Sequence, residues 1–496
     1  MDKIISAEKM RQLEQNVFGL GIDSFAVMEK AALRIYDTVA KRFDRHSKIL
    51  AVCGKGNNGG DGLAATRMLK MSGYDVSAWL PFGEPATADA EKNFEIVKKL
   101  GIDLTEPKNL SKFDVIIDAL FGTGLSKDVE SDIPEKINCS GAFIISADIP
   151  SGISSDTGRV CKTAVKADLT VALGFKKYGH SVYPGREYCG EIIVADIGIP
   201  MGGECDTFET DSEFVKNAIP RTKTDAHKGD MGRICVIAGS KGFTGAAVLC
   251  CEAALKSGSG LVSLFTPENL NEIYEKKITE AMTLPISCKD FIDAELLLKH
   301  SEKLKNADAV VIGPGLSKNC DAGKIIKFLL DNEIPTVIDA DGINSLAANI
   351  NILHEKKGKV ILTPHIGEFS RLTGLSVEEI LTDRLGYARK LAIEYGVVLV
   401  LKGAGTVIAL PSGKAFINHT GNSGMATGGS GDVLSGIIGA LLARGTPAEE
   451  SAVCGVYIHG LAGDFAAEKL GCDSMLPTDT ISFLHNAFLE IKNTDC

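Results

Sequence analysis

The residues best suited to chemistry stand before a long apolar helical pattern in the C-terminal half. Gly428, Gly429 and Gly431 lead into Asp432, and the helical pattern follows over Val433–Ala443. Free backbone N–H groups and the helix dipole at such a start can bind a phosphoryl oxygen or a developing anion. A carboxylate beside bound phosphates can accept a hydroxyl proton, so Asp432 is a candidate general base. The alternative is that Asp432 only caps the helix.

Four other segments in this half follow predicted strands and offer ligand-binding groups. They are Lys402–Thr406 (KGAGT), Thr363–Arg371 (TPHIGEFSR), Gly313–Leu316 (GPGL) and Asp339–Gly342 (DADG). The first could cradle a nucleotide in a hairpin turn, and the second carries His365. Each also has a purely structural interpretation, because a lone histidine, a Gly-Pro-Gly turn or a helix-capping aspartate is common without any ligand.

A second glycine-rich segment lies in the N-terminal half. Gly54–Gly62 (GKGNNGGDG) follows a predicted strand, opens a predicted helix and contains G-x-G-x-x-G. Glycines there allow backbone N–H groups to approach a phosphate, although a tight turn without a ligand has the same pattern. Asn57, Asn58 and Asp61 add oxygens that suit a cation or a polar ring. The next strand ends without the acidic residue of a dinucleotide fold, which disfavours a simple dehydrogenase.

Two further strand ends in this half carry polar residues. Asp118–Ser126 (DALFGTGLS) follows one predicted strand and Asp148–Gly152 (DIPSG) follows the next. Ligands bind at the carboxyl ends of parallel strands in open α/β sheets. Asp118 or Asp148 alone could be a turn former or a helix cap, but three such loops on one sheet edge favour a binding site.

The elements that must hold these loops alternate between strand and helix patterns. In the front half we expect helix over 6–42, broken at Gly19 and Gly21, and over 62–72 and 88–100, and strands over 48–53, 76–80, 114–119, 142–147, 169–173 and 191–197. In the rear half we expect strands over 232–239, 261–265, 309–312, 336–338 and 360–362, then a hairpin of 397–401 with 406–410 and long helices from about 431. Alternation of this kind predicts mostly parallel sheets covered on both faces.

The chain length predicts more than one domain. At 496 residues it exceeds one ordinary core, and the α/β pattern stops after Pro200. The polar stretch that follows is the best linker candidate. We therefore predict an α/β protein with domains at 1–215 and 226–496, joined by a linker at 216–225.

Composition excludes several classes of function. The net charge is −11 without a basic run, so nucleic-acid binding is not expected. The 13 cysteines lack a C-x-x-C motif, the N-terminus lacks a signal-peptide core, and no apolar run could span a membrane, so we expect a cytoplasmic protein. The sequence contains neither H-E-x-x-H nor G-x-S-x-G, which disfavours a zinc or serine hydrolase.

Residues 1–215 resemble the NAD(P)H-hydrate epimerase family. The shared motifs are GKGNNGGDG, DALFGTGL, DIPSG and DIGIP at Asp196–Pro200, and together they are specific. The resemblance implies a Rossmann-like three-layer αβα domain and a K⁺ ion held by Asn58, Asp118 and Ser151. Asp148 is the carboxylate we assign to the epimerisation. The residues implied to contact the hydrated nucleotide, besides Asp148, are Asn57, Asn58, Gly59, Gly60, Asp61, Gly122, Thr123, Gly124, Leu125, Ser126, Lys127 and Asp128.

Residues 226–496 resemble the ribokinase-like NAD(P)H-hydrate dehydratase family. The shared motifs include HKGDMG, GPGL, DADG, LTPHIGEFSRL, LKGAGT and GNSGMATGGSGDVLSG. The resemblance implies an αβα domain that dehydrates the S hydrate with ADP or ATP, by phosphoryl transfer to the ring hydroxyl and loss of phosphate. Asp432 would be the base, and Gly315 and His365 would hold the hydrate. The residues implied to bind the nucleotide are Lys402, Gly403, Ala404, Gly405, Thr406, Gly429, Ser430 and Gly431.

Together these features predict a bifunctional lyase and isomerase that repairs hydrated NADH and NADPH. We expect ADP or ATP, K⁺ and Mg²⁺ as cofactors, a homo-oligomer, and no nucleic-acid or membrane partner. One rival is a ribokinase-type kinase of a vitamin precursor, because its chemistry is the same up to phosphoryl transfer. Another is that the front domain only binds a ligand or partner.

Overall fold

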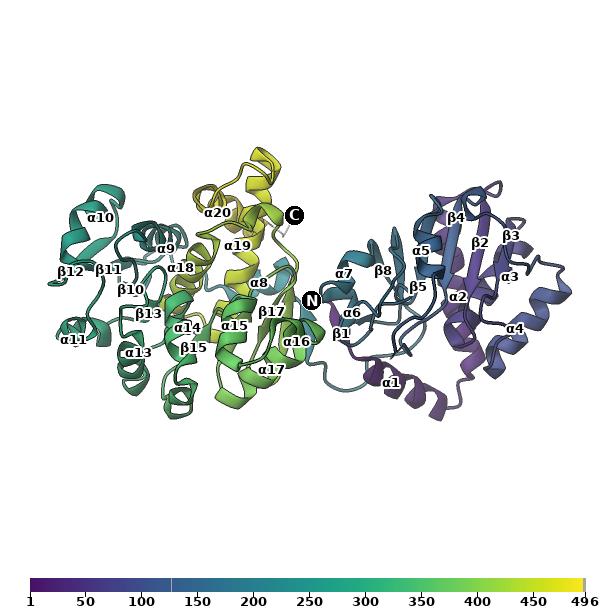
Figure 1. Ribbon diagram of the computed structural model, residues 1–496, viewed down its shortest axis with the longest axis horizontal. Helices are drawn as coiled ribbons and strands as arrows, with labels where there is room; N and C mark the ends of the chain where they lie inside the picture. The colour runs from purple at the N-terminus through teal and green to yellow at the C-terminus, as the bar shows by residue number, and fades with distance from the viewer. Residues whose placement is uncertain (126, 494–496) are drawn as a thin grey trace. The chain divides into compact units, whose positions relative to one another are not determined.

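The computed structural model describes residues 1–125 and 127–493 and contains two compact units (Figure 1). The front unit is Lys3–Thr207, and the rear unit begins at Phe208 and also holds Met1–Asp2. The division therefore falls before the predicted boundary at 215, because α8 (Ser212–Ala218) packs on helices of the rear unit. The extents of the two functional domains stay a prediction.

The front unit is built on a six-stranded, fully parallel sheet. Its order is β3 (Asp75–Trp79), β2 (Lys48–Cys53), β4 (Val115–Ala119), β5 (Phe143–Ala147), β6 (Leu169–Leu173) and β8 (Glu191–Ala195). Alternate strand residues face two apolar layers, because successive side chains point to opposite faces of a sheet. One layer packs against α1 (Ala7–Gly19), α2 (Ser24–Arg42), α3 (Asn57–Met71) and α4 (Ala88–Lys99), the other against α5 (Ile133–Asn138). The predicted three-layer arrangement is confirmed.

Shorter elements complete the front unit. They are β1 (Lys3–Ile5), which pairs with β7 (Lys176–Lys177), the one-turn helices α6 (Tyr178–Ser181) and α7 (Gly185–Tyr188), η1 (Leu110–Lys112), and β9 (Thr207–Glu209) at the boundary. Helix α3 begins at Asn57, five residues before the predicted start at 62, so the glycine and amide segment forms the first helical turn.

The rear unit is built on a larger sheet with the same parallel core. Its order is β12 (Met282–Ile286), β11 (Leu261–Pro267), β10 (Arg233–Ile237), β13 (Ala309–Ile312), β14 (Thr336–Ile338), β15 (Val360–Leu362), β16 (Val398–Leu401), β17 (Thr406–Ala409) and β18 (Ala415–Asn418). The pairs from β12 to β16 are parallel, and the last two are antiparallel hairpin pairs.

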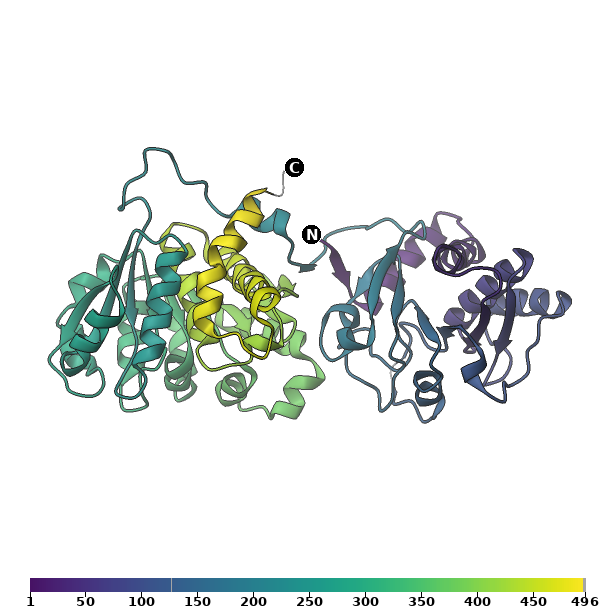
Figure 2. The same ribbon diagram turned by 90° about the horizontal axis from the view of Figure 1, so that it is seen from above.

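Helices lie on both sides of this sheet (Figures 1 and 2). One layer holds α9 (Thr244–Lys256), α18 (Ser430–Ala443), α19 (Ala448–Leu470) and α20 (Pro477–Asn493), and the other holds α13 (Ala322–Asp331), α14 (Ala340–Ala347), α15 (Ile366–Thr373) and α17 (Arg384–Tyr395). Shorter helices are α10 (Asn271–Lys277), α11 (Ala294–Leu298), α12 (Ser301–Lys305) and α16 (Val377–Thr382), with η2 (Glu268–Leu270), η3 (Ile350–Glu355) and η4 (Ser423–Met425).

Helix α18 is buried from Val433 to Ala443 between the sheet and its neighbouring helices. A Cβ atom at Gly436 would lie 2.2 Å from the carbonyl oxygen of Cys250, so glycine is what lets α18 approach α9 this closely. This packing fixes the direction of α18 and therefore the position of its N-terminus, where the glycine-rich segment stands.

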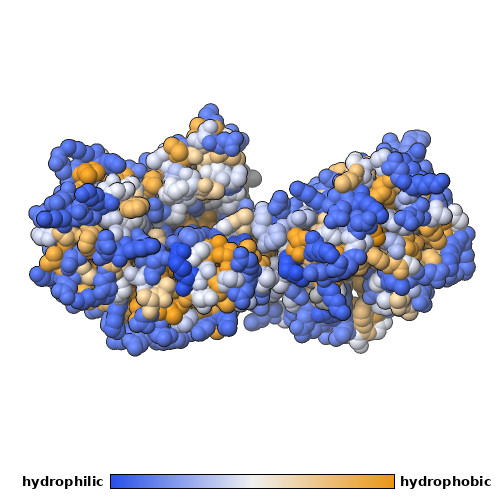
Figure 3. All heavy atoms as spheres, viewed as in Figure 1, coloured by the Kyte–Doolittle hydropathy of each residue, from blue (hydrophilic) through white to orange (hydrophobic). Residues whose placement is uncertain are grey.

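The outer face drawn in Figure 3 is mostly hydrophilic, with scattered apolar residues. None of the helices in the described part of the chain is both long enough and apolar enough to cross a membrane.

Candidate active sites

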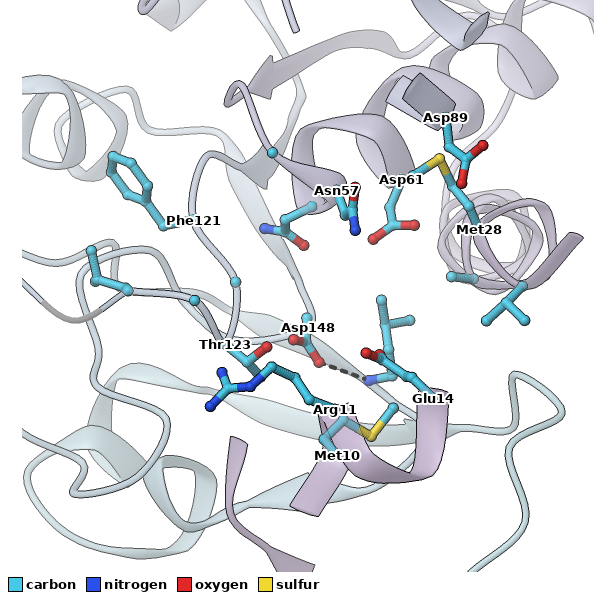
Figure 4. Close-up of a pocket in the computed structure, with 18 of the residues that line it drawn as sticks. Met10, Arg11, Glu14, Met28, Asn57, Asp61, Asp89, Phe121, Thr123 and Asp148 are labelled. Carbon is cyan, nitrogen blue, oxygen red and sulfur yellow. Dashed lines mark hydrogen bonds between the residues drawn. The ribbon is translucent and has the colours of Figure 1, made fainter. Parts of the chain in front are cut away.

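The front unit contains a cavity of about 950 Å³ at the carboxyl ends of its strands (Figure 4). Its walls come from α1, α2, the first turn of α3 and the loops after β4, β5 and β6. The predicted site residues that line it are Asn57, Asn58, Asp61, Gly122, Thr123, Gly124, Leu125, Lys127 and Asp148. The cavity therefore gathers three motifs that are separated by up to about ninety residues in sequence, because parallel strands end at one sheet edge.

Other predicted residues lie away from the cavity wall. Gly59 and Gly60 are buried inside α3, where a Cβ at Gly59 would lie 1.9 Å from the Gly54 carbonyl oxygen. They shape the loop and the helix start. Asp128 pairs with Arg159 at 3.1 Å, and Ser126 lies outside the described residues.

Asp148 stands at the centre of the polar floor. Its backbone has φ of 66°, a left-handed conformation that aspartate tolerates better than most residues. Its Oδ1 atom accepts hydrogen bonds from Lys177 Nζ at 2.5 Å and from the Leu173 N–H at 3.3 Å. The carboxylate therefore has a fixed orientation at the end of β5.

Two residues that support Asp148 were missed by the sequence analysis. Lys177 is 1% exposed, yet it lines the cavity and donates to Asp148 and to the Leu173 carbonyl at 2.7 Å. His180 Nδ1 accepts from the Lys177 N–H at 2.8 Å, so its Nε2 donates to the Asp148 carbonyl at 2.7 Å. Burial, followed by the charge of Lys177, lowers the pKa of His180 to about 4. The only sequence signal was an unexplained Lys-Lys-Tyr-Gly-His run after β6.

Four carboxyl groups line this cavity together with the buried lysine, those of Glu14, Asp61, Asp89 and Asp148. Asp61 is 8% exposed, and burial, followed by the charges of Asp148 and Glu14, raises its pKa well above the ordinary value. Burial and the charge of Asp148 also raise the pKa of Glu14 from α1. Burial and mutual repulsion therefore favour the protonated form of Asp61 and Glu14.

Of the residues assigned to a cation, Asn58 lines the cavity, and Asp118 and Ser151 are buried. Asp118 is fully buried in β4 and accepts from Ser151 Oγ at 2.6 Å, from the Ser151 N–H at 2.9 Å and from Ser146 Oγ at 2.8 Å. Burial raises the pKa of Asp118. Asn58 has both side-chain polar atoms buried without a hydrogen-bond partner in the described chain. An orphaned amide oxygen, a buried carboxyl group and a hydroxyl are the kinds of donor that fit K⁺.

In the rear unit the start of α18 is open toward ligands. Its N-cap is Gly429, in a left-handed conformation with φ of 105°, and a glycine has no side chain with which to cap the first-turn N–H groups. Asp432 lies in that turn. Burial, followed by the charge of Asp339, raises the pKa of Asp432 to about 7, whereas Lys402 lowers it. A carboxyl with this pKa is matched to proton transfer near neutral pH.

A buried network joins α18 to the strand ends. Lys402 Nζ lies 2.7 Å from Asp339 Oδ1, and Ser435 Oγ donates to Asp339 Oδ2 at 2.6 Å. A Cβ at Gly431 would lie 3.1 Å from Lys402 Nζ, which puts this ammonium at the glycine-rich helix start. Lys402, the first residue of the predicted nucleotide loop, therefore places a positive charge beside this helix start.

The remainder of that loop, Gly403–Thr406, forms the turn between β16 and β17. Gly403 and Gly405 have positive φ, and Thr406 Oγ1 donates to the Gly403 carbonyl at 2.8 Å. Arg384 of α17 is buried and donates to the Ala404 carbonyl at 2.9 Å. Arg384 is a further residue that the sequence analysis missed, because nothing marked an arginine eighteen residues before the loop as its support.

The predicted hydrate-binding residues have structural roles of their own. His365 is the N-cap of α15: its Nδ1 accepts from the N–H groups of Gly367 at 3.0 Å and Glu368 at 3.3 Å, while 54% of its side chain is exposed. Gly315 has a φ of 58° and its carbonyl accepts from Ser240 Oγ at 2.8 Å. Both lie at strand ends as expected, and their contact with a hydrate stays a prediction.

Comparison with known proteins covers both units. A family model described as NAD(P)H-hydrate dehydratase matches residues 234–486, and one described as YjeF-related protein N-terminus matches residues 24–179. The bifunctional NAD(P)H-hydrate repair enzyme of Moorella thermoacetica is 38% identical over 97% of this chain and 96% of its own. The protein of that name from Escherichia coli is 34% identical over 96% of this chain and 92% of its own. A ribokinase-like superfamily protein of Enterococcus faecalis is 28% identical, with a TM-score of 0.52 over 59% of this chain and 99% of that one.

Proposed function

We propose the following function for this chain, which belongs to the family of bifunctional NAD(P)H-hydrate repair enzymes. The front domain interconverts the R and S hydrates of NADH and NADPH, and the rear domain dehydrates the S hydrate. The observation that carries the rear assignment is the carboxyl of Asp432, with a pKa of about 7, in the uncapped first turn of α18.

In the rear domain we assign the proton transfer to Asp432. Its carboxylate takes the proton of the ring hydroxyl while that oxygen attacks the terminal phosphorus of the nucleotide. The backbone N–H groups of Gly429–Gly431 and the Lys402 ammonium stabilise the charge on the transferring phosphoryl group. The carbon–oxygen bond then breaks, phosphate leaves with its electron pair, and loss of a proton from the neighbouring ring carbon restores the dihydronicotinamide.

We assign nucleotide binding to Lys402–Thr406 and Gly429–Gly431. The turn fixed by Arg384 presents backbone N–H groups beside the helix start, which suits a chain of phosphates. No group of three or more histidine, cysteine or acidic side chains able to hold a metal exists in the described chain. That fits Mg²⁺ bound mainly through the phosphates, as is usual for this ion. We propose ADP as the phosphoryl donor, with ATP as the alternative.

In the front domain we assign hydrate binding to the cavity lined by Asn57, Asp61, Gly122–Leu125 and Lys127. Asp148, held by Lys177 and His180, accepts a proton during epimerisation. Asn58, Asp118 and Ser151 would hold K⁺, whose charge would help to bind the anionic nucleotide. An assembly of identical chains and a cytoplasmic location remain predictions of the sequence.

The test is recovery of absorbance at the reduced-nicotinamide band from a purified mixture of R and S hydrates, with ADP, ATP or neither. We expect complete recovery with the preferred nucleotide and none without it. If the absorbance stopped rising once the S hydrate was consumed, the front domain would not be an active epimerase. Accumulation of a stable phosphorylated product would instead support the kinase interpretation.

A further inference from the structure

Two carboxyl groups face the front cavity from different elements. Asp61 comes from the fifth position of α3, just after its first turn, and Asp148 directly follows β5 (Figure 4). In this view the two carboxyl groups point toward the open space from opposite sides, with Glu14 beside Asp148. A ring bound between them would meet one carboxyl group on each side.

The surroundings of these two groups differ. Asp148 is ion-paired with Lys177 and accepts a backbone hydrogen bond. Asp61 makes no hydrogen bond or ion pair within the described residues, although it is 8% exposed. A buried carboxyl group without a donor favours its neutral form, whereas a carboxyl paired with an ammonium favours its anion.

Of the other charged groups near Asp61, the carboxyl groups of Asp148 and Glu14 act in the same direction as burial, and the charge of Lys177 opposes them. Burial raises the pKa of Asp61 most, and the charges of Asp148 and Glu14 raise it further. Lys177 lowers this pKa, but its ammonium already donates to Asp148 and to the Leu173 carbonyl. On the packed helices, Asp89 of α4 pairs with Lys92, and Glu29 of α2 pairs with Arg67. Cys53 of β2 supplies no positive charge, because its thiol is buried and burial raises its pKa. These neighbours leave Asp61 without a cation of its own.

We propose that Asp61 is the general acid of the epimerisation and that Asp148 is the general base. This inference rests on the proposed function of the front domain and adds a catalytic role to a residue so far assigned only to binding.

The chemistry of the hydrate requires such a pair. Its hydroxyl stands on a ring carbon that is bonded to the ring nitrogen, so ring opening needs one proton removed from oxygen and one supplied to nitrogen. Asp148 takes the hydroxyl proton, a carbon–oxygen double bond forms, and the carbon–nitrogen bond breaks with its electron pair going to nitrogen. Asp61 gives its proton to that nitrogen.

The product of this step is an open-chain aldehyde with an N–H group. Rotation about the neighbouring carbon–carbon bond presents the other face of the aldehyde to the nitrogen. Ring closure then returns the nitrogen proton to Asp61, and Asp148 returns its proton to oxygen. The cycle consumes no nucleotide or redox partner, and both carboxyl groups end in their starting states.

The test uses the full chain with purified R hydrate and no nucleotide, so that only epimerisation is observed. Asp61→Asn keeps the size and hydrogen-bonding capacity of a neutral carboxyl but has no acidic proton to transfer. We expect kcat to fall by about 100-fold or more, the range of general acid catalysis, with KM changed less than about threefold. Asp37→Asn, on the outer part of α2 and paired with Arg34, is the matched control and should keep full activity.

The pH profile separates acid catalysis from binding. Activity of the natural protein should fall at high pH, where Asp61, whose pKa is raised by burial, loses its proton. In Asp61→Asn the fall at high pH should disappear, while ADP-dependent dehydration of S hydrate stays unchanged and reports an intact fold. Retention of kcat, a rise in KM alone, or persistence of the high-pH limb in this variant would overturn the role of Asp61. Absence of epimerisation in the natural protein would instead overturn the proposed function itself.

Discussion

Lys402 Nζ lies 2.7 Å from Asp339 Oδ1, although the two residues are 63 positions apart in sequence. Asp339 follows β14 and is 1% exposed, and Lys402 follows β16. These two strands are separated by β15 and end at the same edge of the parallel sheet, which brings the two residues together. The pair neutralises a buried carboxylate and holds an ammonium beside the start of α18. It also sets part of the electrostatic environment of Asp432, because Asp339 raises the pKa of Asp432 and Lys402 lowers it.

Replacing the lysine tests this relationship. Lys402→Met should lower the free energy of unfolding of the rear domain by about 3 kcal/mol at pH 7, because it leaves Asp339 as an unpaired buried charge. Calorimetry of the rear-domain transition measures the change. Lys414→Met, on the exposed turn between β17 and β18, should leave the transition where it is. Equal stability of the two variants would contradict the importance of the pair.

Asp432 should make the rear domain less stable as its carboxyl ionises. Its folded pKa of about 7 lies above the ordinary value of 3.8, so the folded state binds more protons between these pH values. Stability therefore decreases as pH rises from about 4 to 7. Asp432→Asn removes that loss and should stabilise the rear domain at pH 8 by roughly 2 kcal/mol, after allowance for its partial exposure, and by much less at pH 4. A gain that does not vary with pH would rule out this explanation.

His180 should make the front domain sensitive to acid. Its folded pKa of about 4 lies below the ordinary 6.5, so the stability it contributes is complete above pH 6.5 and is lost as pH falls toward 4. The stability difference between the natural protein and His180→Asn should shrink by on the order of 2 kcal/mol over this range. Fluorescence of Trp79, the single tryptophan and part of the front core, reports the unfolding.

The exposed His46 supplies the control for that measurement. His46→Asn should differ from the natural protein by a constant amount from pH 7 to 4.5. If His180→Asn also shows a constant difference, the buried neutral histidine is not what couples the front domain to pH.

Asn58 should govern a dependence of epimerisation on K⁺. Its orphaned amide atoms, together with Asp118 and Ser151, give the donor set described above. At constant ionic strength, replacing tetramethylammonium with K⁺ should raise the rate of epimerisation of the R hydrate several-fold in the natural protein. Asn58→Ala should remove that response. If the rate of Asn58→Ala still increased with K⁺, the ion would have to be bound by other residues.

Much of the fold followed from periodicity. The predicted strands 48–53, 169–173, 309–312, 336–338 and 360–362 coincide with β2, β6, β13, β14 and β15, because buried parallel strands form short apolar runs bounded by turns. Strand β12 was not predicted. It contains Pro285 and stands at the edge of the sheet, so its pattern is weak.

The placement of the candidate residues was predictable where glycine and polar residues mark a strand end, as at Asn57–Asp61 and Asp148, or a helix start, as at Asp432, while their roles stay predictions. The residues that support them were not predictable in the same way. Lys177 and Arg384 act through contacts with Asp148 and the Ala404 carbonyl, and such contacts depend on tertiary packing. A lysine in a polar run resembles any solvated lysine until the fold buries it.

The central claim is that Asp432 accepts the hydroxyl proton during ADP-dependent dehydration. Its most direct test is the turnover number of Asp432→Asn for purified S hydrate at saturating ADP, followed by absorbance of the restored dihydronicotinamide. The turnover number should fall by about 100-fold or more, with epimerisation of the R hydrate unchanged in the same protein. Turnover within a few-fold of the natural protein would contradict it.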